Sequence, residues 1–289
     1  MRPTIQRMMP HLLAVVILLV GCSSKRTQPD ADAAVVVAVS IAPLATLVDR
    51  LVGDAVELLV MIPAGASPAT HEPSMRQMQL LSKASVYVKV GHPAFAFEYS
   101  WLGRLLAHNS SMIIVDAARQ AQADVDDPHL WTSPQVMRNV AQSIAVTLQS
   151  VLPEQSDAIS SNLQQLLAEI DALDQQIREI LANDVGKSFY VFHPAWGWFA
   201  ENYGLQQVSI EQHGAHGTEP SPEELAQVVE QARKDKVSVI FVQSQFSSRS
   251  AQLIADEVGA RVVAIDPLAA DWLANMRRVA IALHEAWTP

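Results

Sequence analysis

The sequence predicts an α/β fold with two lobes, each built on a parallel sheet, joined by a long backbone helix. In both halves of the chain, short runs rich in β-branched residues alternate with amphipathic stretches, a pattern typical of βα units. Between the halves, residues 153–182 keep one uninterrupted helical periodicity. The chain has 289 residues, which is enough for two lobes of ordinary size.

The first 33 residues predict an export signal and a tether. Residues 1–21 carry Arg2 and Arg7 before an apolar run that is too short to span a bilayer, as in secretory signal peptides. The run ends in LVGC, which resembles the lipobox of bacterial lipoproteins and implies cleavage before Cys22 and lipid attachment to its sulfur. The alternative is an ordinary signal peptide with a chance cysteine. Residues 22–33 are small and polar, as expected of a lipidated, flexible tether.

Composition restricts the chemistry. Cys22 is the only cysteine, so no intrachain disulfide can form and any metal must be held by His, Asp or Glu. The formal net charge is −10, and becomes −12 when Arg2 and Arg7 leave with the signal. An acidic chain of this kind has little to neutralise phosphates, so nucleic acid is not an expected partner.

The two lobes are predicted over residues 34–152 and 186–289. Strands are expected at 35–41, 56–62, 85–91 and 112–115 in the first lobe, and at 188–192, 205–210, 237–243 and 261–265 in the second. Helices are expected at 43–52, 74–84, 221–234, 246–258 and 268–286.

The segment 153–185 is predicted to be the linking helix. From Pro153 to Ala182 apolar residues recur at steps of three and four, with no Gly or Pro after Pro153. At 1.5 Å per residue such a helix would be roughly 40 Å long. The alternative is a crossover helix within one doubly wound sheet, although crossover helices are commonly half that length.

Three potential metal ligands follow predicted strands. His193 comes directly after the strand at 188–192, Asp266 directly after the strand at 261–265, and His129 follows 112–115 after an acidic loop. Each adjoins a proline, which restricts the loop that carries it. Taken singly, a solvated histidine or an Asp-Pro helix start would explain each, but ligands of α/β sheets bind beyond the carboxyl ends of strands. Imidazole and carboxylate groups suit Zn²⁺ and are acceptable to Mn²⁺.

The chain resembles the substrate-binding lipoproteins of metal ABC transporters, the zinc/manganese-binding family. The resemblance extends over the mature chain and rests on the order of its motifs: VSIAPLATLVDRLVGD, GASPATHEPSMRQM, DPHLW, FHPAWGWFAENYGL, TEPSPEELAQVVEQ and IDPLAADWLANM. It implies two α/β lobes on a helical backbone, metal binding by His129 and His193, and a carboxylate from Asp266 that completes the site. It also implies delivery of the metal to an ABC permease.

One ligand of that family pattern is missing. The family's first histidine directly follows a proline in a loop resembling SPHTYEP, whereas this chain has SPATHEP with Ala69 at that place. His92, at the end of the strand 85–91, is the favoured replacement because a strand end is well fixed. His71, two residues further along the loop, is the second choice, and water or Glu72 is the third.

Other histidines receive plainer interpretations. His213 and His216 lie near Glu211 on a Gly-containing loop that is expected to be solvated rather than metal-binding. His108 and His284 are expected at the surface.

The leading functional hypothesis is capture of a divalent transition metal outside the cytoplasm, by a monomer anchored to a membrane through Cys22 and facing the periplasm or the cell exterior. Zinc is expected, with manganese as the alternative, because several nitrogen ligands suit zinc better. A secreted metallohydrolase would need a general base such as Glu72 or Glu211, but the chain contains no HExxH or Ser-His-Asp pattern. A surface adhesin and a binder of a metal chelate, such as a siderophore or cobalamin, are further alternatives.

Overall fold

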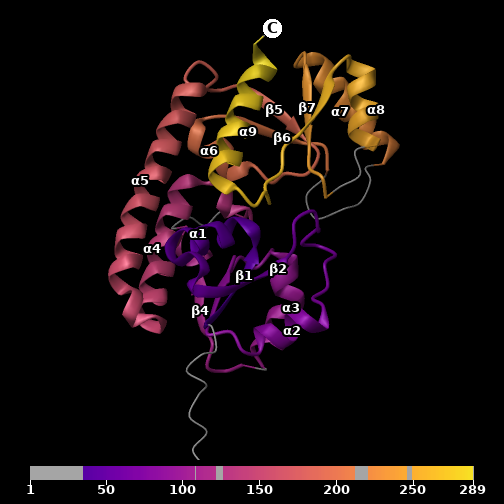
Figure 1. The fold of residues 1–289 in the computed structure, drawn as a ribbon. Helices are drawn as coiled ribbons and strands as arrows, with labels where there is room; N and C mark the ends of the chain where they lie inside the picture. The colour runs from indigo at the N-terminus through magenta and orange to yellow at the C-terminus, as the bar shows by residue number, and fades with distance from the viewer. Residues whose placement is uncertain (1–34, 108, 122–125, 212–220, 246–248, 289) are drawn as a thin grey trace, which may run out of the picture. The chain divides into compact units, whose positions relative to one another are not determined.

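The computed structural model describes residues 35–107, 109–121, 126–211, 221–245 and 249–288 (Figure 1). Residues Ala34–Pro289 form one compact unit. The predicted signal peptide, the tether and Cys22 lie outside the described residues. Within the described residues, no helix is long and apolar enough to cross a membrane.

The first sheet has four parallel strands in the order β2-β1-β3-β4. The strands are β1 (Val35–Ile41), β2 (Val56–Ile62), β3 (Val86–Lys89) and β4 (Ile113–Asp116). The central strands β1 and β3 are buried almost throughout, which explains why their sequences are nearly continuous apolar runs.

The helices of the first half are α1 (Ala42–Val52), α2 (Met75–Leu81), α3 (Ala96–Leu106) and α4 (Pro134–Val151), with 3₁₀ helices η1 (Gly53–Ala55), η2 (Ala118–Gln120) and η3 (Leu130–Thr132). Helices α3 and α4 were not predicted. The signal for α4 is present, however: Ser133 caps the backbone NH of Val136, and Pro134 occupies the first turn. Helix α4 buries one apolar face.

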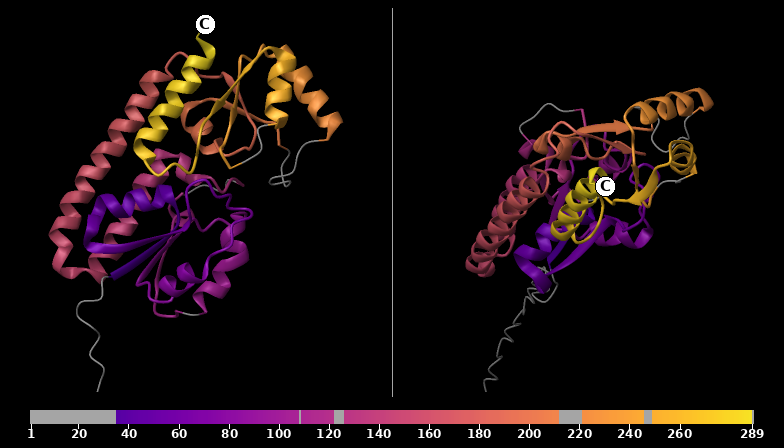
Figure 2. Two further views of the ribbon diagram at one scale, coloured as in Figure 1. Left: turned by 45° about the vertical axis from the view of Figure 1, so that its right-hand side comes forward. Right: turned by 90° about the horizontal axis from the view of Figure 1, so that it is seen from above.

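The long helix predicted near the middle of the chain exists as α5 (Ser156–Ile180), after the 3₁₀ helix η4 (Pro153–Gln155). Its 25 residues correspond to about 37 Å. It packs against α1 and α4 and also against α9 of the second half, so it runs beside elements of both lobes (Figures 1 and 2). Its buried face consists of Ile159, Leu166, Ile170, Leu173 and Ile177.

The second sheet repeats the topology of the first, with parallel strands in the order β6-β5-β7-β8. Its strands are β5 (Ser188–Val191), β6 (Gln206–Ser209), β7 (Val239–Val242) and β8 (Arg261–Ala264). Its helices are α6 (Gly197–Tyr203), α7 (Pro222–Lys234), α8 (Arg249–Val258) and α9 (Trp272–Trp287). Two separate sheets confirm the two-lobed fold and exclude the single doubly wound sheet. The exact boundaries at 152 and 185 stay a prediction.

An apolar core continues from one lobe into the other. One cluster of buried residues includes the first sheet, α4, α5, part of the second sheet and α9, and a smaller cluster lies under α7 and α8. Trp131 donates from Nε1 to the carbonyl of Pro267 at 2.8 Å, and Trp272 donates to the carbonyl of Trp131 at 2.8 Å. These bonds join the loop after β8 to the loop that carries His129.

In each sheet the strand order reverses between the first and third strands, β1 and β3 in one lobe and β5 and β7 in the other. Ligands of open α/β sheets bind at this point, beyond the carboxyl ends of the strands. His193 follows β5 and His92 follows β3, so the topology places both near such a point.

Candidate metal centre

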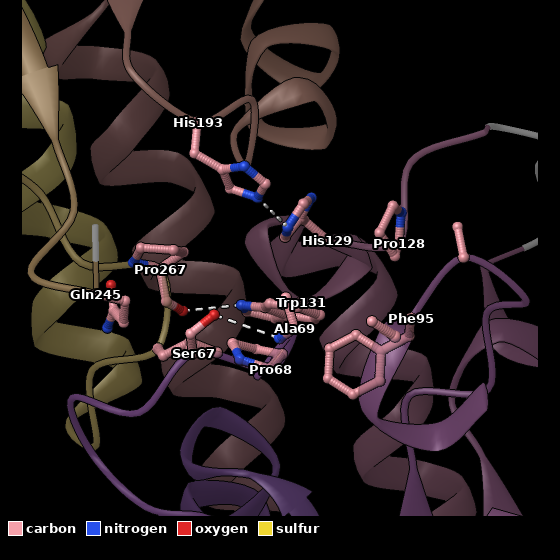
Figure 3. A pocket seen from close by; sticks show the side chains of 13 residues that line it. Ser67, Pro68, Ala69, Phe95, Pro128, His129, Trp131, His193, Gln245 and Pro267 are labelled. Carbon is pink, nitrogen blue, oxygen red and sulfur yellow. Dashed lines mark hydrogen bonds between the residues drawn. The ribbon is translucent and has the colours of Figure 1, made fainter. Parts of the chain in front are cut away.

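Two of the predicted ligands meet where the lobes face each other. His193 lies two residues after β5, and His129 directly precedes η3. Their Nε2 atoms are 3.3 Å apart and their rings are nearly perpendicular, at 81°. Both side chains line a cavity of about 50 Å³ (Figure 3).

This separation matches tetrahedral zinc coordination. Two Zn–N bonds of about 2.0–2.1 Å at the tetrahedral angle place their nitrogen atoms about 3.3–3.4 Å apart. The two Nε2 atoms therefore already have the spacing of two ligands on one zinc ion.

A carboxylate lies behind each imidazole. Asp127 Oδ1 is 2.7 Å from His129 Nδ1, and Glu211 Oε2 is 2.5 Å from His193 Nδ1. Such a carboxylate keeps the hydrogen on Nδ1 and leaves the Nε2 lone pair for a metal. Both imidazoles therefore turn their coordinating nitrogen toward the cavity.

Asp127 is itself held in place. Its Oδ1 also accepts the backbone NH of His129 at 2.9 Å, and its carbonyl accepts Trp198 Nε1 at 2.8 Å. Gly197 makes room for it, because a Cβ at that glycine would lie 2.4 Å from Asp127 Oδ2. The first residue of α6 thus permits the close approach of the carboxylate that orients His129.

The charges of the site favour metal binding. Burial lowers the pKa of His193 below its ordinary value, and the opposing effects of Glu211 and Asp127 do not restore it. Burial alone would raise the pKa of Asp127, but its hydrogen bonds with the side chain and backbone of His129 and its electrostatic interaction with that residue lower it more. The site therefore keeps a neutral imidazole at His193 and an ionised carboxylate at Asp127 near pH 7.

Asp266 lies beside this cavity with its carboxylate already engaged. Oδ1 accepts Gln245 Nε2 at 2.8 Å and the backbone NH of Leu268 at 2.9 Å. Gln245, Pro267 and Leu268 all line the cavity. Among the described residues, Oδ2 has no hydrogen-bond partner.

The two candidate replacement ligands lie elsewhere on the first lobe. His92 accepts the backbone NH of Ala94 at Nδ1, at 3.1 Å. His71 packs beside Phe97 with 6.0 Å between ring centroids, and its buried Nε2 has no partner among the described residues. Neither histidine is among the described residues that line the cavity. The described part of the chain contains no group of three His, Cys, Asp or Glu side chains that could hold a metal. The roles of His71, His92 and Asp266 stay predictions.

The loop that lacks the family histidine does reach the cavity. Ser67, Pro68 and Ala69 line it, so Ala69 occupies a place from which a histidine would face the imidazoles. The loop turns at this point, because the backbone NH groups of Thr70 and His71 both donate to the carbonyl of Ser67.

Three side chains next to the two imidazoles or on the cavity wall were not predicted to belong to the site: Asp127, Glu211 and Gln245. Glu211 was expected in a solvated cluster, but only 2% of it is exposed and it contacts His193. Its position two residues after β6, the neighbour of β5, was the signal that could have identified it. Asp127 could have been found from its spacing of two from His129. His213 and His216 lie outside the described residues.

Two tryptophans are buried in the second lobe, and His284, which was expected at the surface, is partly exposed. Trp196 and Trp272 are buried, and Trp272 contacts the loop of His129 through Trp131. His284 is partly exposed, with 40% of its side chain accessible, and its Nδ1 is 2.7 Å from Asp184 Oδ2.

Known proteins resemble this chain over most of its length. A crystal structure of ZnuA is similar, with a TM-score of 0.80 and 37% identity over 88% of this chain and 99% of that one. The zinc-binding lipoprotein AdcA of Streptococcus pneumoniae serotype 4 is 24% identical over 87% of this chain and 53% of its own length. This chain therefore spans about half the length of that relative. The high-affinity zinc uptake system protein ZnuA of Bacillus subtilis is 23% identical over 89% of this chain and 86% of its own length.

The family comparison covers nearly all of the described residues. Residues 37–286 match the family described as ZnuA, zinc-uptake complex component A, periplasmic. That description is of a transport component and not of an enzyme, so the metallohydrolase alternative is set aside. From this match, the two-lobed fold and the paired imidazoles, the chain belongs to the ZnuA family of periplasmic zinc-uptake components.

Proposed function

We propose that this protein captures zinc outside the cytoplasm and delivers it to an ABC permease. The observation that carries the proposal is the 3.3 Å separation of the Nε2 atoms of His129 and His193, each backed by a carboxylate. Zinc is the cargo in this account, a substrate that the protein binds and later gives up.

In the proposed site, His129 and His193 are the two fixed ligands. Asp266 is the candidate third ligand, because its neighbours Pro267 and Leu268 line the cavity; its Oδ1 would have to leave Gln245 Nε2 and the backbone NH of Leu268, or its Oδ2 would have to turn toward the metal. His92 and His71 remain candidates for a further ligand if their loops move inward. Two neutral imidazoles favour zinc over manganese, which prefers harder oxygen ligands.

Release of the metal would require partial separation of the lobes. The imidazoles come from opposite lobes, so a small opening would break one coordination bond at a time. The hydrogen bond from Trp131 to Pro267 and the long helix α5 restrict such an opening to a modest movement. Anchoring through Cys22, a monomeric state and a location facing the periplasm or cell exterior are parts of the same proposal.

Calorimetric titration of the metal-free chain with zinc and with manganese tests this proposal. Zinc should bind at one site and more tightly than manganese. His129→Ala and His193→Ala should each weaken zinc binding by about a hundredfold or more, since a lost ligand costs at least as much as a lost outer hydrogen bond. His284→Ala, at a partly exposed histidine away from the cavity, is the matched control and should leave affinity unchanged. Equal zinc affinity in the wild type and in all three variants would contradict the proposal.

A further inference from the structure

The cavity beside the two imidazoles is larger and more apolar than a bare metal ion needs. Its volume of about 50 Å³ has room for roughly four water-sized groups. The wall around it includes Ala94 and Ala96, together with Ala69 and Phe95, which are labelled in Figure 3. Among the described lining residues, none is Lys, Arg, Asp or Glu.

The described side chains do not fill a zinc coordination shell. Zinc in proteins takes four ligands, and the described residues bring two imidazole nitrogens together. Asp266 is engaged with Gln245 and Leu268, so two of the four positions remain for groups from outside the protein. Ala69, which stands where the family pattern has a histidine, lines the same cavity.

Gln245 supplies a second, independent observation. Its Nε2 donates to Asp266, while its Oε1 is buried and has no hydrogen-bond partner among the described residues. Gln245 lines the same cavity. A buried amide oxygen without a donor is costly, by about 1–3 kcal/mol, so it indicates a missing N–H or O–H group.

We infer that the cargo is zinc together with a small amino-carboxylate, such as a free amino acid, which chelates the metal through its amine nitrogen and carboxylate oxygen. This inference rests on the proposed function. The amine would donate to Gln245 Oε1, and the short body of the molecule would lie against Ala69, Ala94 and Phe95. The chelator would carry a single negative charge. The metal would balance this charge, since the described lining residues include no Lys or Arg.

Water is the other possible source of the missing ligand. A water molecule on zinc would satisfy Gln245 Oε1, but the rest of the cavity would hold further waters against alanine and phenylalanine side chains. Such waters need two to four polar partners each, which this wall does not offer. A chelator with a short apolar body fits both the polar and the apolar parts of the cavity.

The test compares zinc binding with and without the chelator, using the full chain purified in detergent and stripped of metal. Zinc is titrated alone, with glycine and with L-alanine, while glycinamide and acetate, which each lack one donor, serve as matched controls. Free amino acid competes for zinc, so it weakens apparent binding to a site filled by protein ligands. The same amino acid strengthens zinc binding to a site that takes the chelate. We therefore expect zinc affinity to rise about tenfold with glycine or L-alanine, and not to rise with glycinamide or acetate. Native mass spectrometry should then show zinc and one amino acid retained together.

Variants at Ala69 separate the possible outcomes. Ala69→His restores the family ligand, and should bind zinc alone more tightly and lose the gain from glycine. Ala69→Leu fills the space without a donor and should lose the retained amino acid, and Ala69→Ser serves as the conservative variant if leucine is not accommodated. If glycine weakens zinc binding in the wild type, as it is expected to do in Ala69→His, the inference is overturned. The proposal of zinc capture would still stand. Failure to bind zinc under every condition would overturn the proposed function as well.

Discussion

The imidazoles of His129 and His193 approach each other to 3.3 Å across the two lobes, each with its Nδ1 beside a carboxylate. One histidine precedes a 3₁₀ helix of the first half and the other follows the first strand of the second sheet. The approach of the two imidazoles therefore depends on how the lobes are held together, in addition to the two side chains themselves.

The orienting carboxylates should matter nearly as much as the ligands. Asp127→Asn and Glu211→Gln each keep the size of the side chain but remove the charge that holds the hydrogen on Nδ1. Zinc affinity should fall by about 10–100-fold in each variant, measured by competition with a fluorescent chelator. Glu169→Gln, which alters a surface ion pair with Arg50, is the control. Unchanged affinity in Asp127→Asn and Glu211→Gln would show that the carboxylates do not set the tautomers.

Gly197 should be necessary for the position of Asp127. In Gly197→Ala the new methyl group would meet Asp127 Oδ2, which forces the carboxylate away from His129 Nδ1. We expect zinc affinity to fall toward that of Asp127→Asn, by about tenfold or more. Gly103→Ala, where a Cβ meets no atom within 4 Å, is the matched control. A double variant of Gly197→Ala with Asp127→Asn should bind no more weakly than Asp127→Asn alone, and an additive loss would argue against a shared mechanism.

The hydrogen bond between Trp131 and Pro267 should stabilise the joined lobes. Trp131→Phe keeps an aromatic ring but leaves the carbonyl of Pro267 without its donor. The free energy of unfolding in urea should fall by about 1–3 kcal/mol. Trp101→Phe, at a half-buried tryptophan beside Arg104, should change it by about 0.5 kcal/mol or less. Equal effects of the two substitutions would contradict a specific role for the Trp131 bond.

Acid should destabilise the fold partly through Asp184. Burial alone would raise the pKa of this carboxyl, but the hydrogen bonds and charges of Lys187 and His284 lower it below its ordinary value. A lowered folded-state pKa stabilises the protein above the unfolded-state pKa of about 3.9, and that contribution is lost as pH falls below this value toward the folded-state pKa. The free energy of unfolding of the wild type should therefore fall more steeply below about pH 4 than that of Asp184→Asn. Parallel curves for the two proteins would refute this assignment.

The sequence predicted the strands and the long helix because their signals are local. Continuous runs such as VVVAVSI predict buried parallel strands, and the spacing of Leu166, Ile170, Leu173 and Ile177 predicts one face of a helix. Helix α4 was not predicted, although Ser133 and Pro134 mark its start and its buried apolar residues recur at helical spacing.

The site was predicted only in part for a different reason. The sequence predicts His129 and His193 as ligands because each adjoins proline near the end of a strand or after its loop, and the structure brings their Nε2 atoms to 3.3 Å. Asp127 and Glu211 acquire their roles through packing, which brings β6 beside β5 and seats Gly197 against the loop of His129. The path of residues 67–71, which brings Ala69 rather than His71 to the cavity, depends on a turn that the motif alone does not specify.

X-ray absorption spectroscopy of the zinc-loaded chain tests the central claim most directly, because it counts the imidazoles bound to the metal. The wild type should show imidazole nitrogens at about 2.0–2.1 Å from zinc, and His129→Ala and His193→Ala should each show one imidazole fewer. A zinc spectrum without imidazole scattering, or one that neither substitution changes, would contradict the assignment of these two histidines as the ligands that hold the metal.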